Sequence, residues 1–222
     1  MPIETSGRRP LKTRDWPFFK NLAAWLARHG ATPNAISFAS IVFGCLAGAS
    51  LAVTSHVEGW ASRACWLAAA AFIQLRLIAN LLDGMVAVEG RKGGPVGDLW
   101  NEAPDRVSDA AIFIGAGYAA GGEPLLGYGA ALVAVFVAYV RALGASVGVG
   151  QIFLGPQAKQ QRMALMTEAC VLSAALPADH WASGVQPGLY VKVALLAVIV
   201  GGIITAGRRL ARIAALLREK AH

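Results

Sequence analysis

Charged side chains are scarce in this sequence. Only 15% of its 222 residues are Asp, Glu, Lys or Arg, whereas 56% are hydrophobic, and the mean hydropathy is +0.52. A soluble domain ordinarily carries about 25% charged residues. The composition therefore excludes a soluble globular domain and indicates an integral membrane protein.

Cysteine is scarce as well. The three cysteines, Cys45, Cys65 and Cys170, stand singly in apolar stretches without metal-ligand spacing. This pattern argues against a disulfide framework or a cysteine-based metal site. We interpret all three as reduced residues that fill space in the packing.

Long apolar runs are, by contrast, abundant. A helix needs roughly 20 apolar residues to cross the ~30 Å hydrocarbon core of a bilayer. Such runs lie at 35–54, 61–82, 104–121, 124–148, 163–178 and 189–207. We therefore predict an all-α membrane protein with six transmembrane helices, forming a bundle over 35–207 within a single domain, 1–222.

The ends of the chain are polar or amphipathic. Residues 1–15 are polar and are expected to be flexible. In residues 16–30, large apolar side chains fall on one helical side and Lys20 and Arg28 on another, which predicts an amphipathic helix in the membrane interface. Residues 208–222 form a basic C-terminal tail.

The basic residues predict the orientation. Under the six-span arrangement they fall on one face: before the first span, at Arg91 and Lys92, at Lys159, and from Arg208 to Lys220. Positive charge is retained in the cytoplasm, so we predict a cytoplasmic (inner) membrane protein with both termini inside. Anionic lipid headgroups explain the net charge of +7 without a nucleic-acid partner.

Oxygen-bearing side chains recur where the second and third spans meet this face. Asn80 and Asp83 are three residues apart, and Asn101 and Asp105 are four apart. At such steps two side chains lie on the same side of a helix. Four converging oxygen ligands suit Mg²⁺ or Mn²⁺, which also bind substrate phosphates.

A structural alternative exists for the same residues. The acidic groups could cap helix ends and form ion pairs with Arg76, Arg91 or Arg106 at the membrane surface. For any single acidic residue, a structural role and a functional role are equally supported. The regular spacing of the whole set favours a functional site.

The segment from Asn80 to Asp105 resembles the signature of the CDP-alcohol phosphotransferases, D-x2-D-G-x2-A-R-x8-G-x3-D-x3-D, without insertion or deletion. The matching positions are Asp83, Gly84, Ala87, Gly97 and Asp105, and the differing ones are Asn80, Val88 and Asn101. Two further stretches are similar to the family: A-T-P-N-A-I-S at 31–37, and Y-V-R-A-L-G-A-S-V-G at 139–148 with Q-A-K-Q-Q-R-M-A-L at 157–165. The later stretches resemble the phosphatidylinositol-phosphate synthase branch.

The resemblance implies a homodimeric membrane enzyme of phospholipid synthesis. It would transfer a phosphatidyl or related phosphoalcohol group from a CDP-linked donor, foremost CDP-diacylglycerol, to a polar hydroxyl acceptor, with release of CMP. In the family this motif holds two divalent ions, and the resemblance implies Asn80, Asp83, Asn101 and Asp105 as the ligands for Mg²⁺ or Mn²⁺. Asp105 would also activate the acceptor hydroxyl as the catalytic base. The implied nucleotide-binding residues are Thr32, Asn34, Gly84, Ala87 and Gly97, and the implied acceptor-phosphate ligands are Arg141, Lys159 and Arg162.

The departures from the signature leave the activity open. Each asparagine keeps an oxygen but removes a negative charge, and Val88 removes a positive group. Asp98 and Glu102 lie within one helical turn of the motif and are candidates to restore the metal ligands. The alternatives are a catalytically altered or inactive member that binds lipid or nucleotide, and an ion-coupled transporter.

Overall fold

The computed structural model describes residues 15–89, 97–176 and 188–220, without the side chains of residues 89 and 97–101. The described residues form helices and no strand, which confirms the all-α prediction. The seven helices are α1 (Pro17–Arg28), α2 (Pro33–Val53), α3 (Gly59–Glu89), α4 (Gly97–Gly117), α5 (Pro124–Ser146), α6 (Lys159–Ala175) and α7 (Leu189–Lys220). The residues predicted as a basic tail continue α7 as helix as far as Lys220.

Four of these helices, α2, α3, α5 and α7, are long and apolar enough to cross a membrane. Six crossings were predicted, so α4 and α6 differ from the expectation in this respect. The reason is physical: α6 has only 17 residues, and the first half of α4 carries several charged residues. The protein is a membrane protein with several spans, and the crossing of the bilayer by α4 and α6 stays a prediction.

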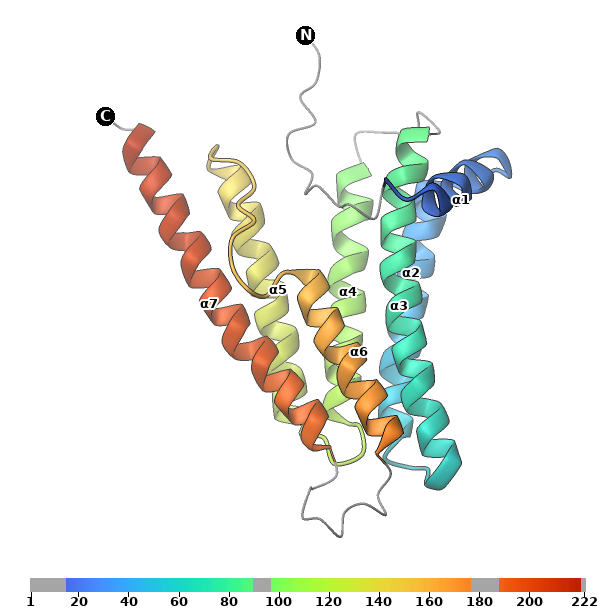
Figure 1. The fold of residues 1–222 in the computed structure, drawn as a ribbon. Coiled ribbons are helices and arrows are strands. Elements are labelled where there is room, and N and C mark those ends of the chain that lie inside the picture. The colour runs from blue at the N-terminus through green and yellow to red at the C-terminus, as the bar shows by residue number, and fades with distance from the viewer. Residues whose placement is uncertain (1–14, 90–96, 177–187, 221–222) are drawn as a thin grey trace.

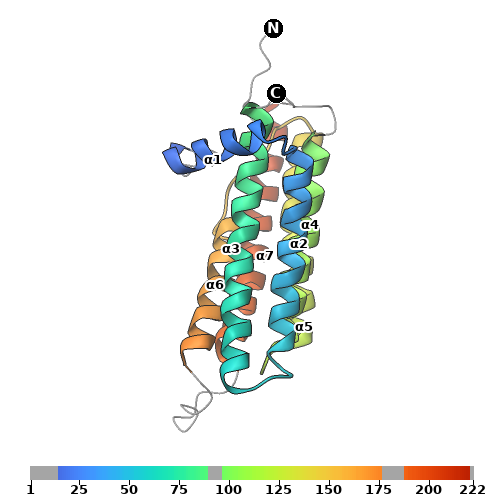
Figure 2. The ribbon, with the colours of Figure 1, turned by 90° about the vertical axis from the view of Figure 1, so that its right-hand side faces the viewer.

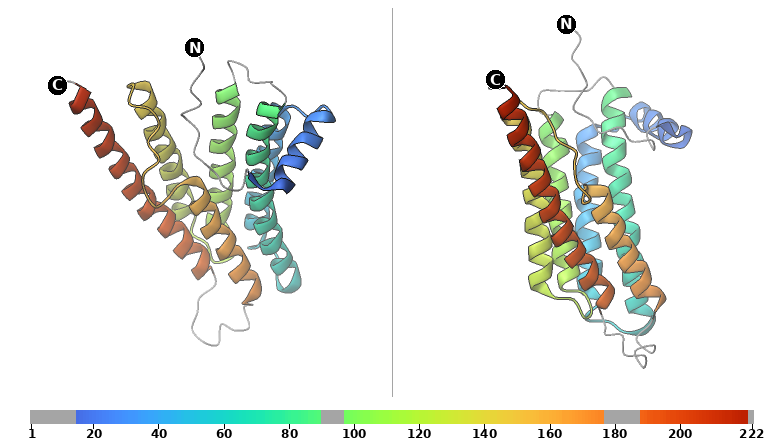
Figure 3. Two further views of the ribbon diagram at one scale, coloured as in Figure 1. Left: turned by 45° about the horizontal axis from the view of Figure 1, so that its top comes forward. Right: turned by 60° about the vertical axis from the view of Figure 1, so that its left-hand side comes forward.

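Six of the helices form a ring. Contacts run from α2 to α3, α6, α7, α5, α4 and back to α2, and the long axes lie roughly side by side (Figures 1 and 3). The buried apolar side chains of these helices form one large core. The C-terminal end of α7 and the helix α1 lie at the same end of the bundle (Figure 1).

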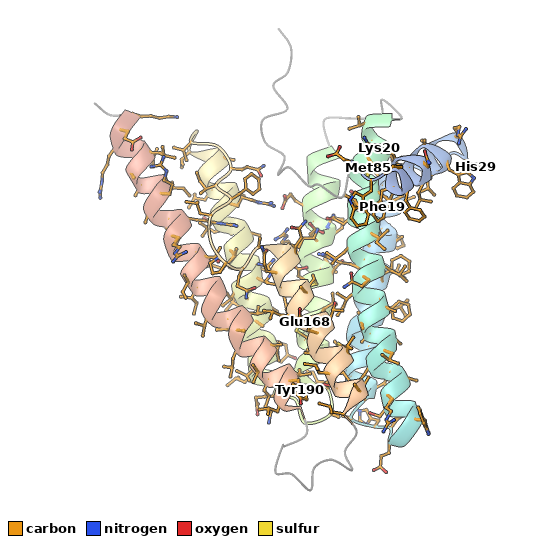
Figure 4. All side chains as sticks on the ribbon, in the orientation of Figure 1. Phe19, Lys20, His29, Met85, Glu168 and Tyr190 are labelled. Carbon is orange, nitrogen blue, oxygen red and sulfur yellow. The ribbon has the colours of Figure 1, made fainter. Side chains whose placement is uncertain are left out.

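Helix α1 lies across the bundle (Figure 2). Its apolar side packs on the last turns of α3, where Ala23 is buried with Leu82 and Val86. Figure 4 places Phe19 and Met85 at this contact. Helix α1 therefore has the orientation expected of an interfacial helix. It lies at the end of the bundle where α3 ends.

Helices α2 and α4 approach closely because small residues line their contact. A methyl group added to Gly48 would lie 2.3 Å from the carbonyl oxygen of Ala111, and one added to Gly115 would lie 2.2 Å from that of Gly48. Gly44 faces Ser108 in the same way. Small residues at this spacing are typical of helix contacts in membranes.

The chain returns into the bundle after α5. Residues 147–158 run back along α5 and α7, and α6 begins about halfway along the bundle (Figure 1). Two residues of α7 hold this return segment: Arg209 Nε donates to the carbonyl of Leu154 at 2.9 Å, and the amide of Gln157 donates to Thr205 Oγ1 at 3.0 Å. The return segment thereby brings Lys159, the first residue of α6, among α3 and α4.

Candidate functional site

The last turns of α3 bring two of the predicted residues to the site. Asp83 is buried, with 4% of its surface exposed. Ser37 of α2 donates a hydrogen bond of 2.8 Å to Asp83 Oδ2, while Oδ1 is buried and has no hydrogen-bond partner among the described residues. A buried carboxylate oxygen without a partner is costly, so Asp83 has one oxygen available to a ligand.

Asp105 of α4 lies at the centre of the site. The ammonium nitrogen of Lys159 is 2.6 Å from each of its carboxylate oxygens, and it also donates to Asn80 Oδ1. Arg76 Nη2 lies 3.1 Å from Asp105 Oδ1. The structure thus brings Asn80, Asp105 and Lys159 together in direct contact.

One turn further along α4, Asp109 is almost completely buried. Arg76 Nη2 donates to its Oδ1 at 2.6 Å, and Arg162 Nη2 to its Oδ2 at 2.9 Å. Both carboxylate oxygens of Asp109 are therefore paired with guanidinium groups from α3 and α6. Arg76 contacts Asp105 as well, so it links the two acidic residues of α4.

Glu102 and Arg141 form a separate, more exposed pair. The Glu102 carboxylate contacts Arg141 through one oxygen and lies 3.3 Å from Arg106 Nη2 through the other. Almost half of the Glu102 side chain is exposed. The described contacts of Glu102 are thus arginines, and its predicted role as a metal ligand stays a prediction.

The predicted nucleotide-binding residues lie near the same end of the bundle, at the start of α2 and the end of α3. Thr32 caps α2 by accepting a hydrogen bond of 3.2 Å from the amide of Ala35, and Asn34 is exposed. Gly84 and Ala87 are partly buried on α3, and a methyl group added to Gly84 would touch nothing within 4 Å. Gly97 begins α4, whereas the side chains of Asp98 and Asn101 lie outside the described residues.

Three residues of the site were not predicted from the sequence to have a functional role. Arg76 was considered only as an ion-pair partner of the acidic residues, and Asp109, four residues after Asp105, was assigned no role. Ser37, the partner of Asp83, is the last residue of the A-T-P-N-A-I-S stretch at 31–37, but the resemblance of that stretch assigned it no role.

A two-ion metal centre does not fit the side chains described here. In this part of the chain no group of three acidic, histidine or cysteine residues is arranged to hold a metal ion. The oxygens of Asp105 and Asn80 are already bound by Lys159. The free oxygen of Asp83 remains, so the described residues offer one contact for a divalent ion and lack the full ligand set for two.

Comparisons with known proteins agree with this architecture. No protein-family model matches the sequence. The inner membrane protein YnbA of Escherichia coli is 29% identical over 102 residues, which are 44% of this chain. The match spans about half of that relative, 48% of its length.

Solved structures show similarity over most of the chain. The phosphatidylinositol phosphate synthase PgsA1 of Mycobacterium tuberculosis with CDP-DAG bound aligns with a TM-score of 0.67 and 18% identity, covering 89% of this chain and 94% of that chain. Its complex with manganese and citrate has a TM-score of 0.67 and 18% identity, with 88% of each chain covered. The chain therefore shares the fold of a CDP-alcohol phosphotransferase, as its motif predicts.

Proposed function

We propose that this protein is a CDP-alcohol phosphotransferase of the inner membrane that transfers a phosphatidyl group from CDP-diacylglycerol to a polar hydroxyl acceptor. The observation that carries the proposal is that Asn80 and Asp105, two positions of the motif, meet at Lys159 in a fold of this class, with Asp83 three residues after Asn80 on α3. Membrane lipids are its surroundings, and a homodimer is its predicted assembly.

The proposed reaction needs a base and positive charge near the donor pyrophosphate. The acceptor hydroxyl oxygen attacks the phosphorus that carries the lipid, the bond from that phosphorus to the CMP oxygen breaks, and CMP leaves. The hydroxyl proton passes to the Asp105 carboxylate. Lys159, in contact with Asp105, is placed to offset the charge that develops on the pyrophosphate.

The arginines of the site divide into two groups in this proposal. Arg141 is partly exposed, as an acceptor-phosphate ligand must be. Arg162 is buried and bound to Asp109, which supports a role in orienting α6 beneath Lys159. Its predicted contact with the acceptor phosphate stays a prediction.

The proposal is tested with purified protein in detergent, CDP-diacylglycerol, Mn²⁺ or Mg²⁺ and a panel of polar alcohols. CMP release that depends on the acceptor is the expected result. Asp105→Asn should lower the rate by about 100-fold or more, because it removes the base. Glu168→Gln is the matched control, since Glu168 is an exposed acid on α6 (Figure 4), nine residues after Lys159, and it should keep the wild-type rate.

A second candidate function is binding of CDP-lipid without transfer. Its supporting observation is that Lys159 already occupies the oxygens of Asp105 and Asn80. Binding of CDP-diacylglycerol without CMP release for any acceptor would favour this candidate over the enzyme. Full activity of Asp105→Asn would remove Asp105 from the role of base.

A further inference from the structure

We propose that the ammonium group of Lys159 is a built-in cation that replaces one of two divalent ions, so that this site takes a single ion beside Asp83. The inference rests on the proposed function, because it concerns how the same site balances charge around a CDP-lipid. It assigns Lys159 a role different from the acceptor-phosphate ligand that the sequence predicts.

The geometry of Lys159 is that of a coordinated cation. Its nitrogen lies 2.6 Å from both oxygens of Asp105 and contacts Asn80 Oδ1. An ammonium group has three donor hydrogens, and here three oxygens receive them. A divalent ion between Asp105 and Asn80 would compete with the ammonium group for the same three oxygens.

The fold holds Lys159 in this position. The return segment that precedes it is bound to α7 through Leu154 and Gln157. One turn after Lys159, Arg162 is bound to the buried Asp109. The start of α6 is therefore fixed on both sides of Lys159, and the ammonium is set between α3 and α4 by the path of the chain.

The charges of the buried cluster balance without a metal ion. Its three carboxylates are matched by three cations, all in contact with at least one carboxylate: Asp83, Asp105 and Asp109 against Arg76, Lys159 and Arg162. Arg106 lies 3.6 Å from Asp105 in addition. Among the described residues, Asp105 thus has Arg76, Arg106 and Lys159 within ion-pair distance. A divalent ion on Asp105 would add two positive charges beside these three cations, which is unfavourable in a region of low dielectric.

The asparagine at position 80 suits a lysine better than a metal pair. An amide oxygen accepts a hydrogen bond from an ammonium group but contributes no charge to neutralise a divalent ion. Asn80 and Lys159 are thus complementary as hydrogen-bond acceptor and donor. Asp83 Oδ1 is buried and has no hydrogen-bond partner among the residues that the structure describes, and it is the oxygen left for a single ion.

The inference is tested by counting Mn²⁺ ions bound to the purified chain by electron paramagnetic resonance, without CDP-lipid. The wild type should bind at most one Mn²⁺ per chain. Lys159→Ala should gain a second Mn²⁺ ion, or bind the first about 10-fold or more tightly, because removal of the ammonium frees Asp105 and Asn80. Lys159→Gln keeps a side chain of similar length and should show the same gain, so it serves where the alanine variant does not fold.

Two controls locate the effect. Lys20→Ala removes an exposed lysine of α1 and should leave Mn²⁺ binding unchanged. Asp105→Asn combined with Lys159→Gln should lose the added ion. Two Mn²⁺ ions on the wild type, or unchanged binding in folded Lys159→Gln, overturns the inference. Because the count needs no substrate, a gain of Mn²⁺ in the Lys159 variants combined with no CMP release by the wild type for any acceptor overturns the proposed enzyme activity and leaves the inference standing.

Discussion

Two successive turns of α4 carry aspartates with different surroundings. Asp109 is held by Arg76 and Arg162, one guanidinium for each oxygen, and is 1% exposed. Asp105, one turn nearer to the start of α4, shares Arg76 but also binds Lys159. The contact of Lys159 extends to Asn80, and Asp83, three residues after Asn80 on α3, has one oxygen without a partner among the described residues.

In our proposal this difference separates a carboxylate that holds the helices together, Asp109, from one that takes part in the reaction, Asp105. Every oxygen of Asp109 is paired with an arginine from another helix, so this residue ties α3, α4 and α6 together. The turn of Asp105 adds a lysine, an amide and a neighbouring carboxylate with a free oxygen. In our proposal the turn of α4 that carries Asp109 fixes the helices, and the turn that carries Asp105 binds the donor.

Asp109→Asn should have the largest effect on folding. It leaves Arg76 and Arg162 buried beside a neutral amide, and loss of one partner from a buried ion pair costs about 3–5 kcal/mol. Thermal unfolding of the detergent-solubilised protein, followed by circular dichroism, should show a much lower midpoint or no folded protein. Glu168→Gln is the control, and equal midpoints for the two variants would contradict the structural role of Asp109.

Gly48→Ala should have an intermediate effect. The added methyl group would lie 2.3 Å from the Ala111 carbonyl, and overpacking of this kind costs about 1–3 kcal/mol. The contact between α2 and α4 should open and lower the unfolding midpoint. Gly207→Ala is the matched control, because a methyl group there touches nothing within 4 Å and alanine favours the helix; a midpoint below wild type for Gly207→Ala alone would refute the packing argument.

Glu102→Gln should have the smallest effect. Glu102 is exposed and contacts arginines, and exposed ion pairs contribute about 0–1 kcal/mol. In Glu102→Gln, the Mn²⁺ concentration that gives half-maximal CMP release should therefore change less than twofold. A large rise in this Mn²⁺ concentration would place Glu102 among the metal ligands, as a compensation for Asn101. The metal site would then extend beyond Asp83.

The sequence predicted much of the fold because apolar runs mark helices in a membrane protein directly. Each of the six predicted spans overlaps one helix from α2 to α7. The helix ends were less predictable: α3 continues to Glu89 and α7 to Lys220, since helix formation does not stop where the apolar stretch stops. The return of residues 147–158 into the bundle has no signal in hydropathy, because contacts with Thr205 and Arg209 produce it.

The site was predictable in its location and less so in its partners. Spacing places Asn80 with Asp83 and identifies Asp105, because helical periodicity decides which side chains share a side. It does not say which residue of another helix meets them. That Lys159 contacts Asp105 and that Arg76 joins Asp105 to Asp109 follow from the packing of α3, α4 and α6, which no local pattern records.

A structure of the protein determined with CDP-diacylglycerol and Mn²⁺ tests the central claim most directly. We expect the donor pyrophosphate beside Asp83 and Asp105, one Mn²⁺ ion on Asp83, and Lys159 still in contact with Asp105. Two Mn²⁺ ions bridging Asp83 and Asp105 with Lys159 displaced, or a CDP-lipid bound elsewhere on the bundle, would contradict the account.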